Sequence, residues 1–153
     1  MTMPPSQARL SPEELEENFS LLDDWEERYA YIISLGDALP PFPDAERIEA
    51  NKVHGCQSQV WLVARPEDQA PDRIVFQGDS DARIVKGLIA IVTGVFSGRR
   101  PEEVAAMDLR GLFTRLGLDT HLTSGRRNGL ASMVERIKEI ARRHLAAREA
   151  TSS

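Results

Sequence analysis

Apolar residues near the N-terminus recur at the spacing of two amphipathic helices. The sequence SPEE at 11–14 predicts a helix start with Ser11 as the N-cap. The apolar residues that follow share one face of this helix: Leu15, Phe19 and Leu22. Asp24 repeats the capping pattern before a second predicted helix over residues 25–35, which Gly36 closes.

Three short segments in the middle of the chain have the composition of strands. Residues 59–64 hold four consecutive apolar side chains, and residues 73–77 read R-I-V-F-Q. The polar, proline-bearing stretch 65–72 between them indicates an antiparallel hairpin. Residues 47–50 are a weaker strand candidate, so we expect a sheet of about three strands.

The second half of the chain predicts helices. Residues 82–96 are apolar around most of the helix circumference, which is typical of a buried central helix, and the polar stretch 78–81 is expected to cap it. A last helix begins at Thr123 or Ser124 and continues to about Arg148. This order of elements predicts an α+β fold, in which helices pack on one face of a small antiparallel sheet.

Composition fits one ordinary globular domain. The chain has 153 residues, of which 41% are hydrophobic and 28% charged, so we expect a single domain over 1–153 with an ordered core of about 11–148 and flexible ends. A net charge of −5 without a dominant basic tract argues against nucleic-acid binding. No apolar run reaches the roughly 20 residues of a membrane span, and the N-terminus resembles no secretory signal, so we expect a soluble cytoplasmic protein.

Charge is segregated along the sequence. Residues 13–27 carry eight acids and no base, whereas residues 126–148 carry seven bases and two acids. Runs of this kind usually lie on solvated helix faces, and that is the interpretation we favour. The alternative is a docking surface for a protein partner.

Cys56 is the single cysteine of the chain. It therefore cannot form an internal disulfide, and a zinc site built on several cysteines is excluded. Gly55 precedes it, and the residues that follow are polar: Gln57, Ser58 and Gln59. These neighbours are wrong for a core segment, so we expect Cys56 at the tip of a loop anchored by the next strand. A protonated His54 ring near the sulfur would favour the thiolate.

The residues alone leave three interpretations of this thiol open. A buried, inert thiol is the commonest fate of a free cysteine. A cysteine hydrolase needs a base and an orienting group, and nothing in the spacing joins His121 or His144 to Cys56. A loop thiol that reacts with another molecule is the third interpretation, which the polar neighbours favour.

Several longer motifs resemble the SufE family. HGCQSQVW (54–61), GDSDARIVKGLIA (78–90) and HLTSGRRNGL (121–130) occur in the family's order, and WEERYAYIISLG (25–36) also matches. The resemblance extends over about residues 13–145. It implies an α+β fold similar to the IscU-type scaffold proteins and a protein without enzymatic turnover of its own.

The resemblance implies a role in sulfur transfer for Cys56. SufE proteins accept a sulfane sulfur from the persulfide of a SufS-type cysteine desulfurase, stimulate that enzyme, and deliver the sulfur to a SufBCD-type scaffold complex for iron–sulfur cluster assembly. The chain would need no cofactor, because the pyridoxal phosphate belongs to the desulfurase. The resemblance also implies that the protein is a monomer or a weak homodimer.

Asp81 and Arg126 match positions that the family associates with activity or partner contact. Each also has a structural interpretation: Asp81 can stabilise the start of a helix through the helix dipole, and Arg126 can satisfy a backbone carbonyl. His54 can likewise stabilise the loop by a hydrogen bond. The extra charge at Arg127 departs from the family's usual sequence there, whereas CQSQ after Gly55 is typical of the SufE branch rather than the CsdE branch.

We expect the Cys56 loop to lie against apolar surface at rest, where oxidation is slow, and to extend when a desulfurase docks. Transfer of the sulfur is thiol–disulfide exchange in form. The alternative function is an iron–sulfur or metal scaffold, which needs several thiolate ligands; a cysteine hydrolase is the third.

Overall fold

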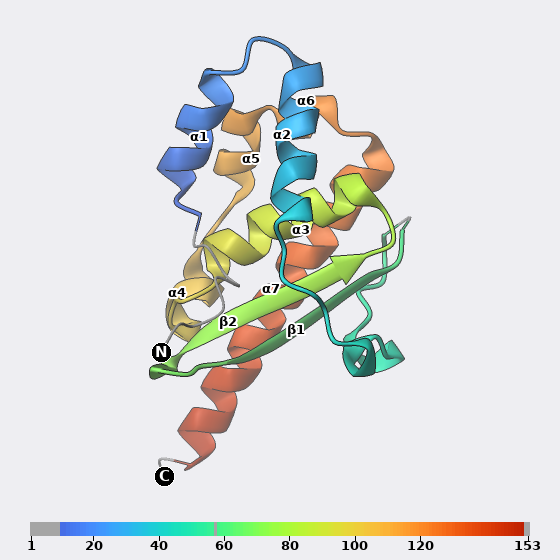
Figure 1. Cartoon of the computed structure of the whole chain (residues 1–153). Helices are drawn as coiled ribbons and strands as arrows, with labels where there is room; N and C mark the ends of the chain where they lie inside the picture. The colour runs from blue at the N-terminus through green and yellow to red at the C-terminus, as the bar shows by residue number, and fades with distance from the viewer. Residues whose placement is uncertain (1–9, 57, 152–153) are drawn as a thin grey trace.

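A computed structural model describes residues 10–56 and 58–151 of the chain (Figure 1). The elements follow in this order: α1 Pro12–Ser20, α2 Trp25–Asp37, the 3-10 helices η1 Asp44–Glu46 and η2 Glu49–Asn51, β1 Val60–Glu67, β2 Ala70–Ser80, α3 Arg83–Phe96, α4 Pro101–Ala106, α5 Arg110–Leu116, α6 Leu118–His121 and α7 Ser124–Thr151. Helix α3 packs against β2, and α7 packs against β1 and α4. The expected α+β fold is confirmed.

Local capping fixes the start of the predicted helices. The Ser11 hydroxyl accepts a hydrogen bond from the Glu14 N–H at 3.2 Å, and the Asp24 carboxylate accepts one from the Glu27 N–H at 2.8 Å. Thr123 accepts the Arg126 N–H at 3.3 Å before α7. Each cap satisfies an amide that the helix leaves unpaired, which is typically worth about 1 kcal/mol.

The predicted hairpin is confirmed and is longer than expected. Strands β1 and β2 pair antiparallel from Val60↔Ser80 to Pro66↔Ile74, so much of the polar stretch 65–72 continues the strands. The expected strand at residues 47–50 is wrong, and the described residues form a sheet of two strands. Beyond this hairpin, Lys52 forms a single bridge to the outer edge of β1, opposite Trp61.

Side-chain hydrogen bonds explain why residues 47–50 do not extend. The Asn51 amide donates to the Glu46 carbonyl oxygen at 2.9 Å and to the Glu46 carboxylate at 3.0 Å. Arg136 of α7 donates to the Ala50 carbonyl at 2.6 Å. The local Asn51 bonds offer the backbone an alternative to a strand ladder, and the Arg136 bond adds a contact from α7, so the chain turns twice in η1 and η2.

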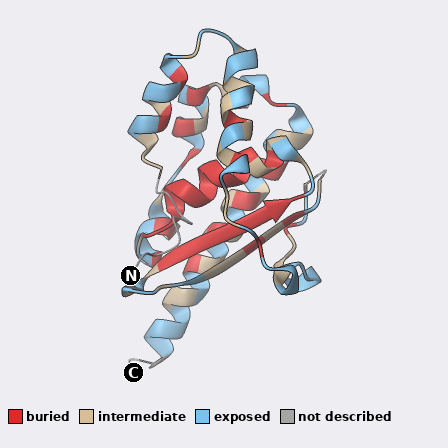
Figure 2. Cartoon of the chain, viewed as in Figure 1, coloured by how far each residue is buried: buried red, intermediate tan, exposed pale blue. Residues whose placement is uncertain are grey.

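The core is centred on α3 and β2, as Figure 2 shows by their burial. Helix α3 is buried from Leu88 to Phe96, as its apolar circumference predicts. The expected end of the second helix at Gly36 is wrong, because α2 continues to Asp37. Gly36 instead lets α2 cross α3 closely, since a Cβ there would lie 2.6 Å from the backbone nitrogen of Gly87.

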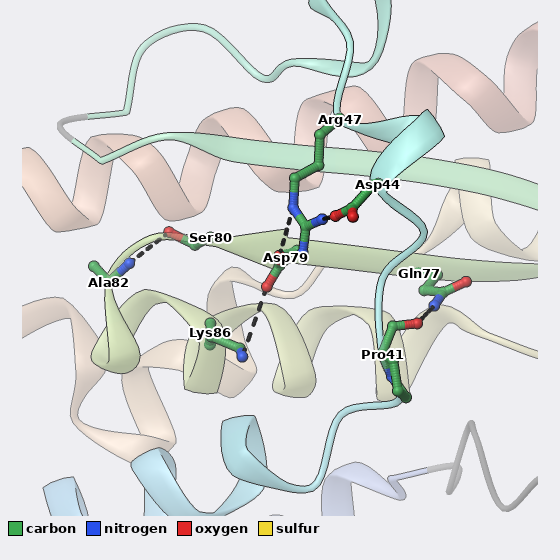
Figure 3. Close-up of polar contacts among 8 residues, drawn as sticks. All are labelled: Pro41, Asp44, Arg47, Gln77, Asp79, Ser80, Ala82 and Lys86. Carbon is green, nitrogen blue, oxygen red and sulfur yellow. Dashed lines mark hydrogen bonds and ion pairs between the residues drawn. The ribbon is translucent and has the colours of Figure 1, made fainter.

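A charged cluster fastens the connector between α2 and β1 onto the sheet (Figure 3). The Arg47 guanidinium donates two hydrogen bonds to one oxygen of the largely buried Asp79, at 2.6 and 3.1 Å. Lys86 of α3 lies 3.7 Å from the other oxygen. Further along the connector, the Gln77 side chain donates to the Pro41 carbonyl at 3.0 Å. These contacts hold the end of β2, two residues before Asp81.

The two charge runs pair with different helices. Glu16 of α1 forms an ion pair with Arg115 of α5 at 2.8 Å, and Arg148 of α7 forms one with Glu102 of α4 at 2.6 Å. Both pairs are substantially exposed, so each contributes little to stability. The solvated-face interpretation and the docking alternative both require this exposure, so both stay open.

Candidate functional site

Cys56 lies on a short loop whose two ends are joined by a buried backbone hydrogen bond between Val53 and Val60, called the neck of the loop. The Val53 N–H donates to the Val60 carbonyl at 2.8 Å, and both residues are buried. Residues 54–59 project from this neck, with Cys56 between its two ends. Gln57, one of the expected supporting residues, lies outside the described residues. The described ends of the loop therefore meet at this buried backbone hydrogen bond.

Gly55 brings the loop down onto helix α7. Its φ of +92° lies in the left-handed region that other residues rarely adopt. A Cβ on Gly55 would also lie 2.7 Å from the Ser132 hydroxyl oxygen. Only glycine meets both conditions, so the position next to Cys56 requires glycine on two independent grounds.

The sulfur of Cys56 is half-buried against α7 and the hydrophobic core. Its Sγ lies 3.7 Å from the Gly129 carbonyl oxygen, within reach of a weak S–H hydrogen bond. A cavity of about 10 Å³ remains beside it, lined by Cys56, Ser58, Val85, Leu88, Gly125, Arg126, Gly129 and Met133. The expectation of a loop tucked against apolar surface is confirmed.

The His54 side chain pairs with Glu49 in this conformation. Its Nε2 lies 3.0 Å from a carboxylate oxygen of Glu49, and the side chain is 74% exposed. Burial raises the pKa of the Cys56 thiol, and no charged group is among the causes of that shift. Of the two roles expected for His54, the geometry favours the loop contact over tuning of the sulfur.

The pH dependence of alkylation tests the burial of Cys56. Burial raises the thiol pKa because apolar surroundings disfavour the charged thiolate. Only the thiolate reacts with iodoacetamide, so we expect the alkylation rate of the folded protein to rise with pH through a midpoint above that of the unfolded protein in urea. A folded midpoint at or below the unfolded one would show that the sulfur is not shielded.

Asp81 holds the C-terminal end of the loop by a hydrogen bond. Its Oδ1 accepts a hydrogen bond from the Gln59 N–H at 3.1 Å. The expectation that the segment 78–81 caps α3 is wrong, because the N-cap is Ala82 and has no side-chain cap bond. The Ala82 N–H is satisfied by the Ser80 hydroxyl at 3.2 Å instead. Asp81 therefore contacts the cysteine loop at Gln59, which is three residues after Cys56.

Removal of the Asp81 carboxylate should loosen this loop. A hydrogen bond of this kind is worth about 1 kcal/mol, which corresponds to about a fivefold change in an equilibrium. We expect Asp81→Ala to raise the rate of Cys56 alkylation at neutral pH by about that factor, because open loops become more populated. Glu26→Ala, which removes an exposed carboxylate of α2, is the control. Equal rates for the two variants would remove Asp81 from this role.

Arg126 lines the cavity beside Cys56 and is half-buried. Its guanidinium has no hydrogen bond or ion pair within the part of the chain that the structure describes. The backbone role considered for Arg126 belongs to its neighbour, since Arg127 donates to the carbonyls of Asp119 and Leu122 at 3.1 and 3.0 Å. The Arg126 charge is not among the causes that shift the pKa of the Cys56 thiol.

The structure divides the expected residues into two groups. Ser58 and Arg126 line the cavity of Cys56, whereas Gly55, Gln59 and Asp81 position the loop. Sequence reasoning missed the wall provided by α3 and α7: Val85, Leu88, Gly129 and Met133. The spacing of four between Gly125 and Gly129 on one helix was a usable signal, because it marks a face that a loop can approach closely.

The described residues hold no group of three histidine, cysteine or acidic side chains suited to a metal ion. None of the helices in that part of the chain combines the length and apolar character needed to cross a bilayer.

Comparisons with known proteins agree with the motifs. The family profile "SufE: Fe-S metabolism associated domain" matches residues 13–141. An uncharacterized SufE-like protein of Rhizobium meliloti (strain 1021) is 47% identical over 138 residues, 90% of this chain and 99% of the relative. One from Rhizobium etli is 48% identical over 138 residues, 90% of this chain and 93% of the relative.

A solved structure has the same fold. The solution structure of a hypothetical protein from Thermus thermophilus matches with a TM-score of 0.71 and covers 95% of this chain and 99% of its own. At 23% identity this likeness concerns the fold alone. The family match spans the cysteine loop, α3 and the first part of α7, and with the two relatives it shows that the chain belongs to the SufE family of iron–sulfur metabolism.

Proposed function

We propose that the protein is a sulfur acceptor and carrier, which takes sulfur onto Cys56 from a partner cysteine desulfurase and delivers it to a SufBCD-type scaffold. The observation that carries this proposal is a lone thiol on a loop with a firm neck and weak outer contacts. Among the described residues, the loop is held by the exposed Asp81 latch, the His54–Glu49 contact and the weak Cys56–Gly129 bond. A donor protein can therefore displace it without unfolding the core.

The transfer step needs one sulfur nucleophile. The Cys56 thiol loses its proton, and the thiolate attacks the outer sulfur of the donor's persulfide. A bond forms between Cys56 Sγ and that sulfur, while the bond to the donor cysteine breaks and the donor leaves as a thiolate. The chain has no second cysteine that would displace the new cargo as sulfide.

The buried resting state protects the thiol before transfer. The pKa of Cys56 is raised, so at neutral pH the sulfur is protonated and reacts slowly with oxidants. On docking, an open loop would bring the sulfur into water or into the donor's site, where the thiolate forms more readily. Stimulation follows because the donor's persulfide transfers its sulfur faster to a Cys56 held beside it than to free thiols in solution.

In this proposal the chain has no cofactor and no turnover of its own, and the pyridoxal phosphate chemistry takes place in a SufS-type partner. A free, exposed thiol in the open state suits a reducing compartment such as the cytoplasm. The alternative of an iron–sulfur scaffold would need thiolates from several chains, because each chain has one cysteine.

A desulfurase assay tests the proposal. The protein is added to a SufS-type desulfurase with L-cysteine, and alanine formation is followed with and without it. We expect a severalfold increase in rate with the desulfurase and no alanine from the protein alone. An unchanged desulfurase rate would contradict the proposal. Uptake of colour with iron and sulfide, without stimulation, would favour the scaffold.

A further inference from the structure

The outer edge of β1 has unpaired backbone groups. Strand β1 pairs with β2 on one side, and Figure 1 shows it as the outer strand of the hairpin, with α7 passing behind it. The Val60 carbonyl points outward, because it accepts the Val53 N–H. Outward groups recur at every second residue of a strand, so the N–H and C=O of Ala64 point the same way. Among the described residues, the bridge from Lys52 ends at Trp61, and Ala64 has no backbone partner on this side.

A groove of about 340 Å³ runs beside this open edge. It is lined by Ala50 of η2, by Leu62 and Ala64 of β1, and by Ile140 and His144 of α7. Ile140 and Ala64 are half-buried apolar residues at the margin of the core. An extended segment that pairs with Ala64 would therefore place alternate side chains against apolar surface of α7.

The wall that α7 gives to this groove is basic. Residues 136–148 carry five bases and one acid, in a chain whose net charge is −5. Arg143, which also lines the groove, is paired with Glu139 at 2.7 Å. Arg136 donates to the Ala50 carbonyl and has no carboxylate partner in the part of the chain that the structure describes, and its buried Nε lacks a hydrogen bond. A carboxylate that enters the groove would supply the missing counter-charge.

We propose that the open edge of β1 and the basic wall of α7 form a docking groove for an extended acidic segment of a partner protein, which adds a strand to the hairpin. Main-chain hydrogen bonds at Ala64 supply affinity, and acidic side chains that face α7 select the partner. The inference goes beyond the proposed function, because the residues that line this groove are different from those that line the pocket of Cys56.

A second copy of this chain fits the edge less well. If two β1 strands paired antiparallel about Ala64, both α7 helices would lie on the same face of the joined sheet, and their basic residues would approach each other. Pro66 of each copy would lie opposite Leu62 of the other, where it has no N–H to donate. An acidic segment from another protein avoids both costs.

Titration of the isotope-labelled protein with a short capped peptide of alternating glutamate and valine tests the proposal. We expect the Ala64 amide resonance to move downfield, because its free N–H becomes hydrogen-bonded. Its exchange with solvent should slow by about tenfold when about nine-tenths of the protein carries peptide. Binding should also weaken as salt is added. An Ala64 amide that is unchanged at saturating peptide would overturn the inference.

Two control peptides separate backbone pairing from charge. The first has lysine in place of glutamate, and the second keeps glutamate but has every backbone amide N-methylated. Each should bind about tenfold more weakly than the parent peptide, since the first meets like charge and the second cannot donate to the β1 edge. Equal affinity of the lysine peptide would remove the acidic preference, and equal affinity of the methylated peptide would remove strand addition.

Variants of the groove provide the second test. Ala64→Pro removes the outward N–H and leaves the ladder to β2 intact, so it should weaken binding, whereas Ala64→Ser keeps the N–H and should bind as wild type. Arg143→Glu should weaken binding about tenfold, because it reverses a charge of the groove. Arg110→Glu, an exposed change in α5, is its control.

Equal affinities within either pair of variants would overturn the inference. The amide spectrum shows whether each variant is folded, and the Arg143 and Arg110 pair decides the outcome if Ala64→Pro is not. A shift of the Ala64 amide with protein concentration alone would show that a second copy occupies the edge, and it would overturn the choice of partner.

These outcomes do not depend on sulfur transfer, and Cys56→Ser should bind the peptide as the natural protein does. If the desulfurase assay fails and the peptide binds at Ala64, the docking groove stands and the carrier function falls. If the assay succeeds and the peptide does not bind, the carrier function stands and the groove falls.

Discussion

Cys56→Ser is expected to abolish sulfur acceptance while leaving the fold intact. Serine is close to isosteric with cysteine, and only the half-buried Sγ with its weak bond to Gly129 is lost. A hydroxyl cannot hold a sulfane sulfur under these conditions, so stimulation of a desulfurase should fall to the level without the protein. The loss should exceed tenfold in the rate increment, measured as alanine formation.

Thermal unfolding provides the check on this variant. We expect the free energy of unfolding of Cys56→Ser to lie within about 1 kcal/mol of that of the natural protein, because the site is at the edge of the core. Full stimulation by a well-folded serine variant would mean that Cys56 is not the acceptor. Loss of stimulation in an unfolded variant would be uninformative, so Cys56→Ala is measured beside it.

Gly87→Ala is expected to produce the largest loss of stability among single methyl additions. A methyl group at Gly87 would collide with the Ile32 carbonyl oxygen and its side chain, at the crossing of α2 and α3. Backbone atoms cannot move aside as a flexible side chain does, so overpacking should outweigh the gain in helix propensity. We expect a net destabilisation of about 2 kcal/mol in urea unfolding.

Gly111→Ala is the matched control. It makes the same chemical change within helix α5, where the new Cβ would meet only the end of the Arg115 side chain at 3.1 Å, an exposed group that can shift while it keeps its ion pair with Glu16. Helix propensity should then dominate and stabilise the protein by up to about 1 kcal/mol. Equal effects of the two substitutions would show that the close crossing of α2 and α3 does not limit the fold.

The parts of the fold that sequence predicted well are those set by local interactions. The caps at Ser11, Asp24 and Thr123 are made by side chains within four residues of their targets. The all-round apolar pattern of residues 82–96 identified the buried helix α3 because the pattern itself requires a core on every side. Neither inference needs knowledge of a distant contact.

The errors arose where distant residues decide the structure. Gly36 has the composition of a helix stop, but its partner is Gly87, and the crossing keeps it inside α2. Residues 47–50 have strand character, yet Arg136 of α7 bonds to the Ala50 carbonyl and, together with the nearby Asn51–Glu46 bonds, keeps their backbone in a turn. Asp81 has the position of a helix cap, and its partner is an amide of the cysteine loop.

The site shows the same division. Sequence identified Cys56 and its glycine, because the residue types themselves indicate a reactive thiol on a tight loop. It could not identify Gly129 or Met133 as walls of the cavity, since they lie more than seventy positions away on α7. It also assigned His54 a possible effect on the sulfur, whereas Glu49 binds the ring in the closed loop.

The most direct measurement follows a heavy sulfur isotope from free cysteine to the protein. L-cysteine that carries the isotope is supplied to a SufS-type desulfurase, the protein is alkylated, and the peptide containing Cys56 is analysed by mass spectrometry. We expect one added heavy sulfur on Cys56, which disappears after reduction and is absent from Cys56→Ser. A Cys56 peptide without added sulfur, recovered while the desulfurase consumes cysteine, would contradict it.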